Sequence, residues 1–391
     1  MSEDHHVISV ITSLSEIDKD DWDACANPPS QPYNPFVSHD FLILLEQSGS
    51  AVPQAGWHSQ HMILKGKDDE VRGVLPCYLK AHSQGEYVFD HGWADAFERA
   101  GGHYYPKLQI SVPFTPVTGP RFLVRAGENV AEVREILARA AAQLAQKLQA
   151  SSIHATFLTK QEWNELGALD YLQRTDQQFH FEDQGYGNFN GFLTALTSRK
   201  RKQLKRERRE ALANGITIDW ISGDDITKEH LDRFYAFYMD TGERKWGTPY
   251  LTRQFFTLLM ERMAYKMLFI FARRNDTIIA GALNMIGGDT LYGRYWGCSE
   301  DHPFLHFEVC YYQAIDYALA HGLKRVEAGA QGGHKLVRGY MPVTTYSAHW
   351  IANAGFREAI ENYLMRERQQ VAFEKEMLVE RAPFKNDNEG N

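Results

Sequence analysis

The feature that most constrains how this chain folds is an order of predicted elements that occurs twice. Each half of the sequence contains a hairpin of two apolar strands, then a third strand, a long helix and a short strand. In the first half these elements are predicted at residues 61–65, 71–80, 86–90, 129–150 and 154–158. In the second half they are predicted at residues 267–272, 278–286, 290–297, 303–321 and 324–329. Meandering strands followed by a helix and a strand are typical of α+β proteins, so the sequence predicts two similar α+β units.

The expected boundary between the two units lies near residue 185. A chain of 391 residues is long enough for two or three domains with their own cores. We expect residues 1–185 to form a first domain and residues 186–385 a second domain, which opens with a basic helix at residues 198–214. Residues 386–391 are polar, and we expect a disordered tail there.

Charge and composition restrict the class of partner. The formal net charge is −8 and the pI is about 6.1, which excludes a surface made to coat nucleic acid or anionic lipid throughout. The first six residues are polar, unlike a secretory signal, and no apolar run approaches the roughly 18 residues of a membrane span. The four cysteines show no CxxC spacing. We therefore expect a cytoplasmic protein with reduced thiols.

A local basic patch nevertheless lies between the two halves. Residues 198–214 are dense in Lys and Arg, Ser198 is placed as an N-cap, and Asn214-Gly215 is a typical helix end. The apolar side of this helix is thin, so most of it must face water or an anion. Such charge suits a phosphate-rich partner, and a merely solvated helix is the alternative. The residues expected to bind an anion or RNA are Arg199, Lys200, Lys202, Lys205, Arg206 and Arg209.

The polar loop after the last predicted strand is the candidate active site, because loops at strand ends commonly carry functional residues. A loop dense in His, Glu, Lys, Arg, Gln and Tyr side chains can supply proton acceptors and donors that bind an anion. The proton acceptors are predicted to be His306, Glu308, Glu327 and His334. The substrate-binding residues are predicted to be Arg294, Tyr295, Trp296, Gln331, Lys335, Arg338 and Tyr340. For each of these residues a structural role is the alternative.

Residues 113–121 form a second candidate for substrate binding. Three prolines in nine residues fix this segment in one shape, so it can present Thr115, Thr118 and Arg121. A structural crossover between strands is the alternative. By contrast, His302, His306 and Cys310 share one helix face but lack a fourth ligand at a telling spacing, so no metal site is predicted.

Several of these motifs together resemble the bacterial FemAB-like family. They are the basic run at 198–216, the proline-rich segment at 113–121, and the segments at 292–297 and 327–332. The resemblance covers most of residues 35–385. It implies two GNAT-like folds in tandem, with a peptidoglycan-biosynthesis-like acyltransferase site in a cleft that uses the second unit.

The resemblance also implies the reaction and its partners. Fem-type enzymes transfer an amino acid from aminoacyl-tRNA to an amine of a cell-wall precursor peptide. The chain departs from them in one respect, since residues 216–221 resume a strand where a helical hairpin is inserted in Fem-type enzymes. A CoA-dependent N-acetyltransferase remains an alternative, although residues 303–308 offer no Gly-rich turn for a pyrophosphate. A non-catalytic RNA- or anion-binding module is a further alternative.

Overall fold

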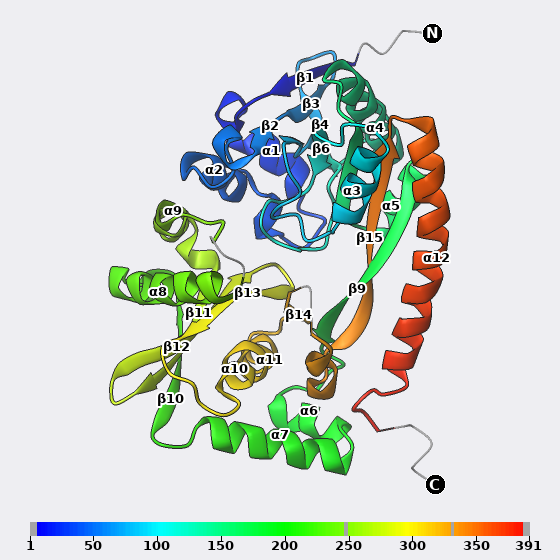
Figure 1. Cartoon of the computed structure of the whole chain (residues 1–391). Helices are drawn as coiled ribbons and strands as arrows, with labels where there is room; N and C mark the ends of the chain where they lie inside the picture. The colour runs from blue at the N-terminus through cyan, green and yellow to red at the C-terminus, as the bar shows by residue number, and fades with distance from the viewer. Residues whose placement is uncertain (1–5, 246–248, 330–331, 386–391) are drawn as a thin grey trace. The chain divides into compact units, whose positions relative to one another are not determined.

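The computed structural model describes residues 6–245, 249–329 and 332–385 (Figure 1), and the tail expected at 386–391 lies outside them. The chain divides into two compact units. Unit 1 comprises Met1–Asp176 and Thr344–Ala372, and unit 2 comprises Gln177–Val343 and Phe373–Asn391. The expected division at residue 185 assigned residues 344–372 to the second domain, whereas their contacts group them with unit 1.

Unit 1 combines short strands with five helices of its own among the described residues. Its strands are β1 (Val7–Ile11), β2 (Trp57–Ser59), β3 (His61–Lys65), β4 (Val71–Leu75), β5 (Tyr78–Lys80), β6 (Lys107–Ile110), β7 (Leu123–Val124) and β8 (Ser152–Leu158). Its helices are α1 (Lys19–Ala26), α2 (His39–Gln47), α3 (His91–Arg99), α4 (Val130–Lys147) and α5 (Lys160–Gly167). Three further elements cross from one unit to the other along the chain, namely β9 (Leu172–Glu182), β15 (Met341–Ile351) and α12 (Ala354–Val379).

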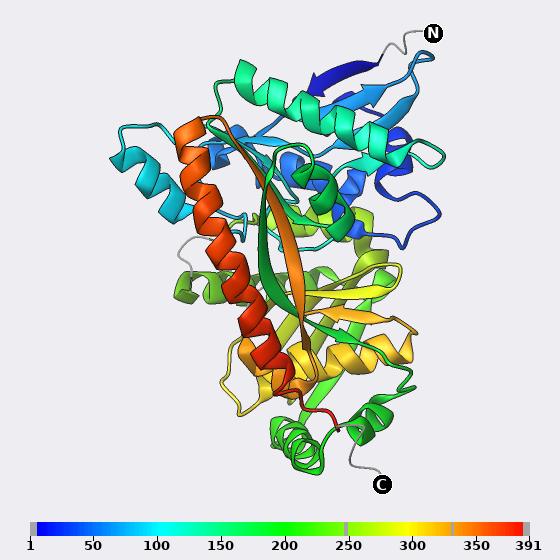
Figure 2. The ribbon, with the colours of Figure 1, turned by 90° about the vertical axis from the view of Figure 1, so that its right-hand side faces the viewer.

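The strands of unit 1 form an antiparallel group in the order β1-β3-β4-β7 and a second group in the order β2-β5-β6-β8-β15. In the second group only β6 and β8 run parallel among the described strands, and α4 lies between them in the chain. Figure 2 shows α4 lying across the strands of the first group. Val133, Leu137 and Ala141 of α4 are fully buried in one apolar cluster with Met62 and Leu64 of β3. This packing explains why the Ala-rich segment forms the predicted helix.

The opposite face of the second strand group is polar and yet buried. Lys80 on β5 lies opposite Lys107 on β6, and His154 on β8 lies opposite His349 on β15. All four side chains are at most 2% exposed. The ammonium group of Lys107 donates to Glu86 Oε2 at 2.7 Å and also to Asp90 and Ser83. Burial of charge is tolerated here because the charges are paired and hydrogen bonded.

Two predicted strands of the first half are wrong in detail. The strand expected at 71–80 is broken at Pro76, which has no N–H for a ladder, and it continues as β5 in the other strand group. The strand expected at 86–90 is irregular. Tyr87 adopts a left-handed conformation with φ +61°, which breaks the extended backbone, and Glu86 and Asp90 on either side of it both pair with Lys107.

Unit 2 is built around one group of strands in the order β10-β11-β12-β13-β14-β9. Its strands are β10 (Ile216–Ser222), β11 (Met267–Arg274), β12 (Thr277–Ile286), β13 (Thr290–Cys298) and β14 (Arg325–Glu327). Its helices are α6 (Phe189–Ala195), α7 (Ser198–Ala211), α8 (Lys228–Lys245), α9 (Arg253–Met263), α10 (Leu305–Phe307) and α11 (Gln313–Ala320). A π-helical turn, Glu308–Tyr312, joins α10 to α11, and a 3₁₀ turn spans Gly333–Arg338. As predicted, β11 and β12 form an antiparallel hairpin.

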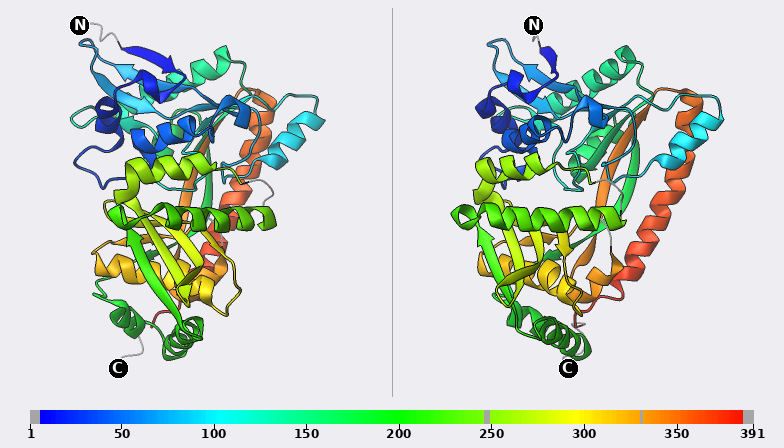
Figure 3. Two further views of the ribbon diagram at one scale, coloured as in Figure 1. Left: turned by 90° about the vertical axis from the view of Figure 1, so that its left-hand side faces the viewer. Right: turned by 60° about the vertical axis from the view of Figure 1, so that its left-hand side comes forward.

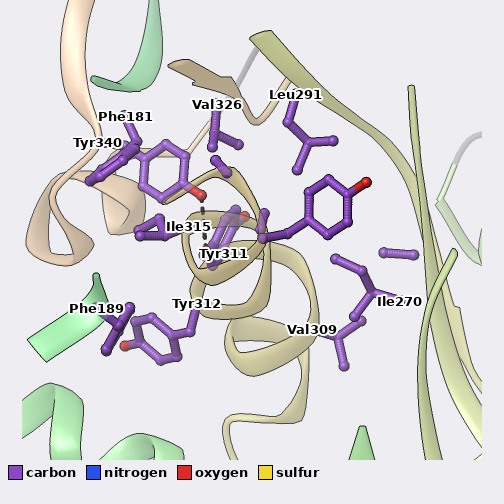
Figure 4. Packing of buried hydrophobic residues seen from close by; sticks show 14 of the residues in the cluster. Phe181, Phe189, Ile270, Leu291, Val309, Tyr311, Tyr312, Ile315, Val326 and Tyr340 are labelled. Carbon is purple, nitrogen blue, oxygen red and sulfur yellow. Dashed lines mark hydrogen bonds between the residues drawn. The ribbon is translucent and has the colours of Figure 1, made fainter. Parts of the chain in front are cut away.

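The strands of unit 2 are covered on both faces by helices (Figure 3). On β11, Phe269 packs against Phe234 of α8 with ring centroids 5.0 Å apart. The next residue, Ile270, belongs to the cluster that includes Ile315 of α11 on the other face (Figure 4). The alternation of side chains along the strand therefore supplies both layers. In the chain, α11 lies between the parallel strands β13 and β14, just as α4 lies between the parallel strands β6 and β8 of unit 1.

Two helix starts differ from the prediction. The basic helix α7 begins at Ser198 itself, its N-cap is Thr197, and no side-chain cap bond is made there. The helix expected from residue 303 begins at Leu305, because Phe304 adopts a left-handed conformation with φ +62°. Gly322 has positive φ and follows the end of α11 as predicted, whereas α7 ends at Ala211, before the positive-φ pair Asn214 and Gly215. In the described part of the chain no helix combines the length and apolarity needed to cross a membrane.

Candidate active site

The candidate site begins where the parallel strands of unit 2 end. Tyr292 and Glu327 are the last paired residues of β13 and β14, and β13 continues beyond them. Arg294, two residues further along β13, donates to Glu327 Oε2 at 3.3 Å. Both side chains are at most 3% exposed. The two predicted residues are thus brought together, and the pair fixes the edge from which the next loop departs.

Lys335 lies directly beyond this edge. Its ammonium nitrogen donates to the carbonyl of Ala328 at 2.7 Å and to that of Gly329 at 3.0 Å, the two residues that follow β14. The side chain is buried, and burial lowers the pKa of Lys335 to about 8, with Arg294 adding to the effect and Cys310 opposing it. An amine with such a pKa can release and accept a proton near neutral pH.

Two of the predicted residues, His306 and His334, both contact Tyr311, which the sequence analysis did not select. The hydroxyl of Tyr311, on the π-helical turn, lies 2.9 Å from His334 Nε2. The ring of His306 is 5.4 Å from that of Tyr311 and 5.1 Å from that of Trp296. His334 is exposed, whereas burial raises the pKa of the Tyr311 phenol above its ordinary value. Tyr311 therefore acts as a neutral hydrogen-bonding partner of His334.

The turn that carries His334 and Lys335 is fastened at its far end. Arg338 donates from one nitrogen to the carbonyl of His334 at 2.6 Å and from the other to Glu207 of α7 at 2.8 Å. Its guanidinium also lies 3.3 Å from the ring centre of Phe307. Gly339, which follows, has φ +88°, a conformation that suits glycine. Arg338, predicted to bind substrate, is instead a buried support of the turn, 4% exposed.

Glu308, predicted as a proton acceptor, is engaged by the basic helix. Its carboxylate accepts from Arg208 at 2.8 Å and from Gln313 at 2.7 Å, and it is fully buried. Arg208 also pairs with Asp316 at 2.8 Å. A buried carboxylate held by a guanidinium in this way anchors α7 to unit 2, and its oxygens are occupied by these partners.

The outer face of α7 is cationic. Arg199, Lys202, Lys205, Arg206 and Arg209 are all exposed, and Lys200 is half-buried. The exposed residues follow the helix at intervals of three and four, which places them on one side. The opposite side carries Leu204, Glu207 and Ala211, which are buried. The helix thus separates an exposed cationic stripe from a face that packs into unit 2.

The other predicted residues do not join this cluster. Tyr340 is fully buried, and its hydroxyl donates to the carbonyl of Tyr311 at 3.1 Å (Figure 4), so it supports the π-helical turn. Tyr295 packs against the rings of Tyr238 and Phe256. Gln331 lies outside the described residues.

The proline-rich segment belongs to unit 1. Arg121 is fully buried, and its guanidinium donates to the carbonyls of its own loop, including those of Val117 and Gly119. It is therefore a structural arginine and not the substrate ligand that the sequence predicted. Thr115 is 3% exposed and Thr118 is half-buried. This geometry agrees with the alternative of a structural crossover.

Glu207, Arg208 and Tyr311 were missed from the sequence. The acid could have been found, because Glu207 shares the spacing of Leu204 and Ala211 and so falls on the buried side of an otherwise basic helix. Within the part of the chain that the structure describes, no group of three or more His, Cys, Asp or Glu side chains is arranged to hold a metal ion.

Comparison with known proteins places this architecture in a family. The described fold matches solved structures at low identity, which shows the tandem GNAT-like fold alone. FemX aligns at 15% identity with a TM-score of 0.55, over 88% of this chain and 98% of that one. The C-terminal domain of a putative lysylphosphatidylglycerol synthetase from Agrobacterium fabrum aligns at 9% identity with a TM-score of 0.52, over 89% and 96%.

A third solved structure, L-PGS from Bacillus licheniformis, aligns at 10% identity with a TM-score of 0.50, over 82% of this chain and 95% of that one. No curated protein sequence matches the chain. The family model described as peptidoglycan biosynthesis/recognition, however, matches residues 13–386, nearly the whole sequence. The chain therefore belongs to the FemAB-like family.

Proposed function

We propose that this protein is an acyltransferase that moves an aminoacyl group from aminoacyl-tRNA to an amine of a peptide or cell-wall precursor. The observation that carries the proposal is the double-sided helix α7. Its exposed cationic stripe suits an RNA backbone, and its buried side is bonded to the turn that holds His334 and Lys335. The family description, peptidoglycan biosynthesis/recognition, supports an acceptor of this class. A cytoplasmic location is part of the same proposal.

In this reaction the acceptor amine attacks the carbonyl carbon of the aminoacyl ester. A C–N bond forms, the ester C–O bond breaks, the amine loses a proton, and the 3′-hydroxyl of the tRNA regains one. We assign the proton transfer to Lys335, because its pKa near 8 leaves part of the population neutral at the pH of the cytoplasm. His334, which lies on the same turn and is hydrogen bonded to Tyr311, is the second group that can carry the proton.

The donor is tested by binding of tRNA across a salt series, measured by fluorescence anisotropy. In the test variant Arg199, Lys202, Lys205, Arg206 and Arg209 are changed to Gln. A charge-matched control changes five exposed cations outside α7 to Gln, namely Arg99, Arg139, Lys147, Lys160 and Lys228. Loss of five phosphate contacts lowers the slope of log affinity against log salt by about 4, whereas the control keeps the wild-type slope.

Two results decide between donors. If tRNA affinity falls steeply with salt and only the α7 variant loses this binding, the result supports an RNA donor. The transfer assay then uses aminoacylated tRNA with wild type and with Lys335→Met. Absent binding of tRNA at low salt rejects that donor. Binding of acetyl-CoA by a protein that does not bind RNA identifies the acyl-CoA alternative. The turn before α10 does not favour that alternative, because its N-cap is the bulky Phe304 and no glycine-rich segment precedes it.

A further inference from the structure

A buried carboxylate interrupts the basic helix α7. Glu207 stands between two arginines in the sequence, yet its side chain is only 2% exposed. It accepts from Arg338 at 2.8 Å, from the hydroxyl of Tyr312, and from Gln203 at 2.9 Å. An acid placed to tune an RNA-binding face would lie among the exposed cations. The Glu207 carboxylate instead lies on the buried side of α7, where it accepts hydrogen bonds from these partners in unit 2.

The partner of Glu207 controls a short segment. Arg338 closes the 3₁₀ turn Gly333–Arg338, bonds back to the carbonyl of His334, and lies on the ring of Phe307. Lys335, within the same turn, reaches the carbonyls after β14. The turn is thus attached at the strand end through Lys335 and at α7 through Arg338, besides the hydrogen bond of His334 to Tyr311.

The attachment at α7 is electrostatically strong. Arg338 is 5% exposed at its side chain, so removing the carboxylate leaves a buried guanidinium without its charged partner. The guanidinium then gains by moving toward water, and the turn that it closes moves with it.

We propose that Glu207 is a positioning residue, which through Arg338 holds the Gly333–Arg338 turn in the geometry that buries the Lys335 amine beside the end of β14. The name of the reaction rests on the proposed function, but the contacts that carry this role do not.

The test measures the pH at which the Lys335 amine loses its proton in the folded protein. A variant that is merely less stable, but still folded, keeps the wild-type value of this midpoint. The groups that face this amine are the carbonyls of Ala328 and Gly329, the Arg294 guanidinium and the Cys310 thiol. The pH dependence of its acetylation by acetic anhydride is followed by mass spectrometry of the resulting peptides. The control, Glu210→Gln, removes an exposed acid from the same helix, where Glu210 pairs with Arg206 at 3.6 Å.

In wild type and in Glu210→Gln the labelling midpoint for Lys335 is expected near 8, the value that burial produces. In Glu207→Gln the midpoint shifts toward 10.5, the ordinary value for lysine, because the turn opens to water. An unchanged midpoint in a folded Glu207→Gln protein overturns the proposal. Arg338→Lys gives the second reading: the same upward shift supports action through Arg338, and no shift refutes it.

The salt-series binding of tRNA to Glu207→Gln separates this inference from the proposed function. If wild type binds no tRNA, the donor is rejected while the Lys335 titration still decides the role of Glu207. If both proteins bind tRNA with equal salt slopes and only the variant shows a shifted midpoint, the positioning role is supported without any change in the RNA contact.

Discussion

The buried lysine of unit 1 gives the sharpest prediction of stability. Lys107 is fully buried and donates to Glu86 at 2.7 Å and to Ser83 at 2.8 Å, and its third partner is Asp90. Changing Lys107 to Met keeps most of the volume but removes the ammonium that pairs with both buried carboxylates, and leaves Glu86 only the longer pair with Lys80 at 3.8 Å. Breaking a buried pair from one side costs about 3–5 kcal/mol. For a unit of this size that corresponds to a fall in Tm of about 6–20 °C.

The assay is urea unfolding followed by tryptophan fluorescence, because Trp57 and Trp93 report on this cluster. The ammonium of Lys80 lies 3.5 Å from the ring centre of Trp57. The matched control is Lys65→Met, which removes a lysine paired with Asp69 at 2.9 Å on the surface. That side chain is 32% exposed and its partner 83%, so the control costs at most about 1 kcal/mol.

A second variant separates charge from packing. Lys107→Met combined with Glu86→Gln removes one of the two carboxylates that lost the Lys107 ammonium, so it recovers part of the lost stability. Equal midpoints for Lys107→Met and Lys65→Met would refute the reasoning, since the buried carboxylates would then carry no charge that needs a cation. A double variant that is less stable than Lys107→Met would point instead to packing as the cause.

Three further outcomes are expected. Burial alone would raise the pKa of Asp90, but the Lys107 ammonium outweighs burial and holds that pKa below its ordinary value of 3.8. The ionised Asp90 carboxylate therefore stabilises the fold above pH 3.8, and this stabilisation is lost as the pH falls further. In acid unfolding, wild type is expected to lose stability relative to Asp90→Asn, and parallel curves of stability against pH would contradict this. Arg208→Ala strips the cation from the fully buried Glu308 and lowers the stability of unit 2 by about 3–5 kcal/mol in urea unfolding, whereas Arg209→Ala, an exposed neighbour, changes it little. Gly297→Ala places a Cβ 2.4 Å from the carbonyl oxygen of Phe237 in α8, so it costs about 1–3 kcal/mol or more, and a variant as stable as wild type would show that α8 moves freely away from β13.

Local patterns in the sequence determined much of the secondary structure. The Ala-rich segment forms α4, the hairpin of β11 and β12 lies where its turn predicts, and α7 ends at Ala211, shortly before the positive-φ pair Asn214-Gly215. These elements were predictable because their signals lie within a few residues, in apolar spacing, turn chemistry and helix ends. The two-fold order of elements likewise predicted two α+β units, and the alignments with solved structures agree with the tandem GNAT-like fold.

The tertiary structure alone decided the roles of the charged residues. Glu207 and Arg338 are 131 positions apart in the chain, and Arg208 and Glu308 are 100 apart, so no local pattern pairs them. The sequence therefore identified a polar loop and a basic helix, but it could not distinguish a charged residue that accepts a proton from one that holds two segments together, as Glu308 does. A charged side chain changes its role with burial and with its partner, because water no longer screens it, and both are set only when distant segments pack together.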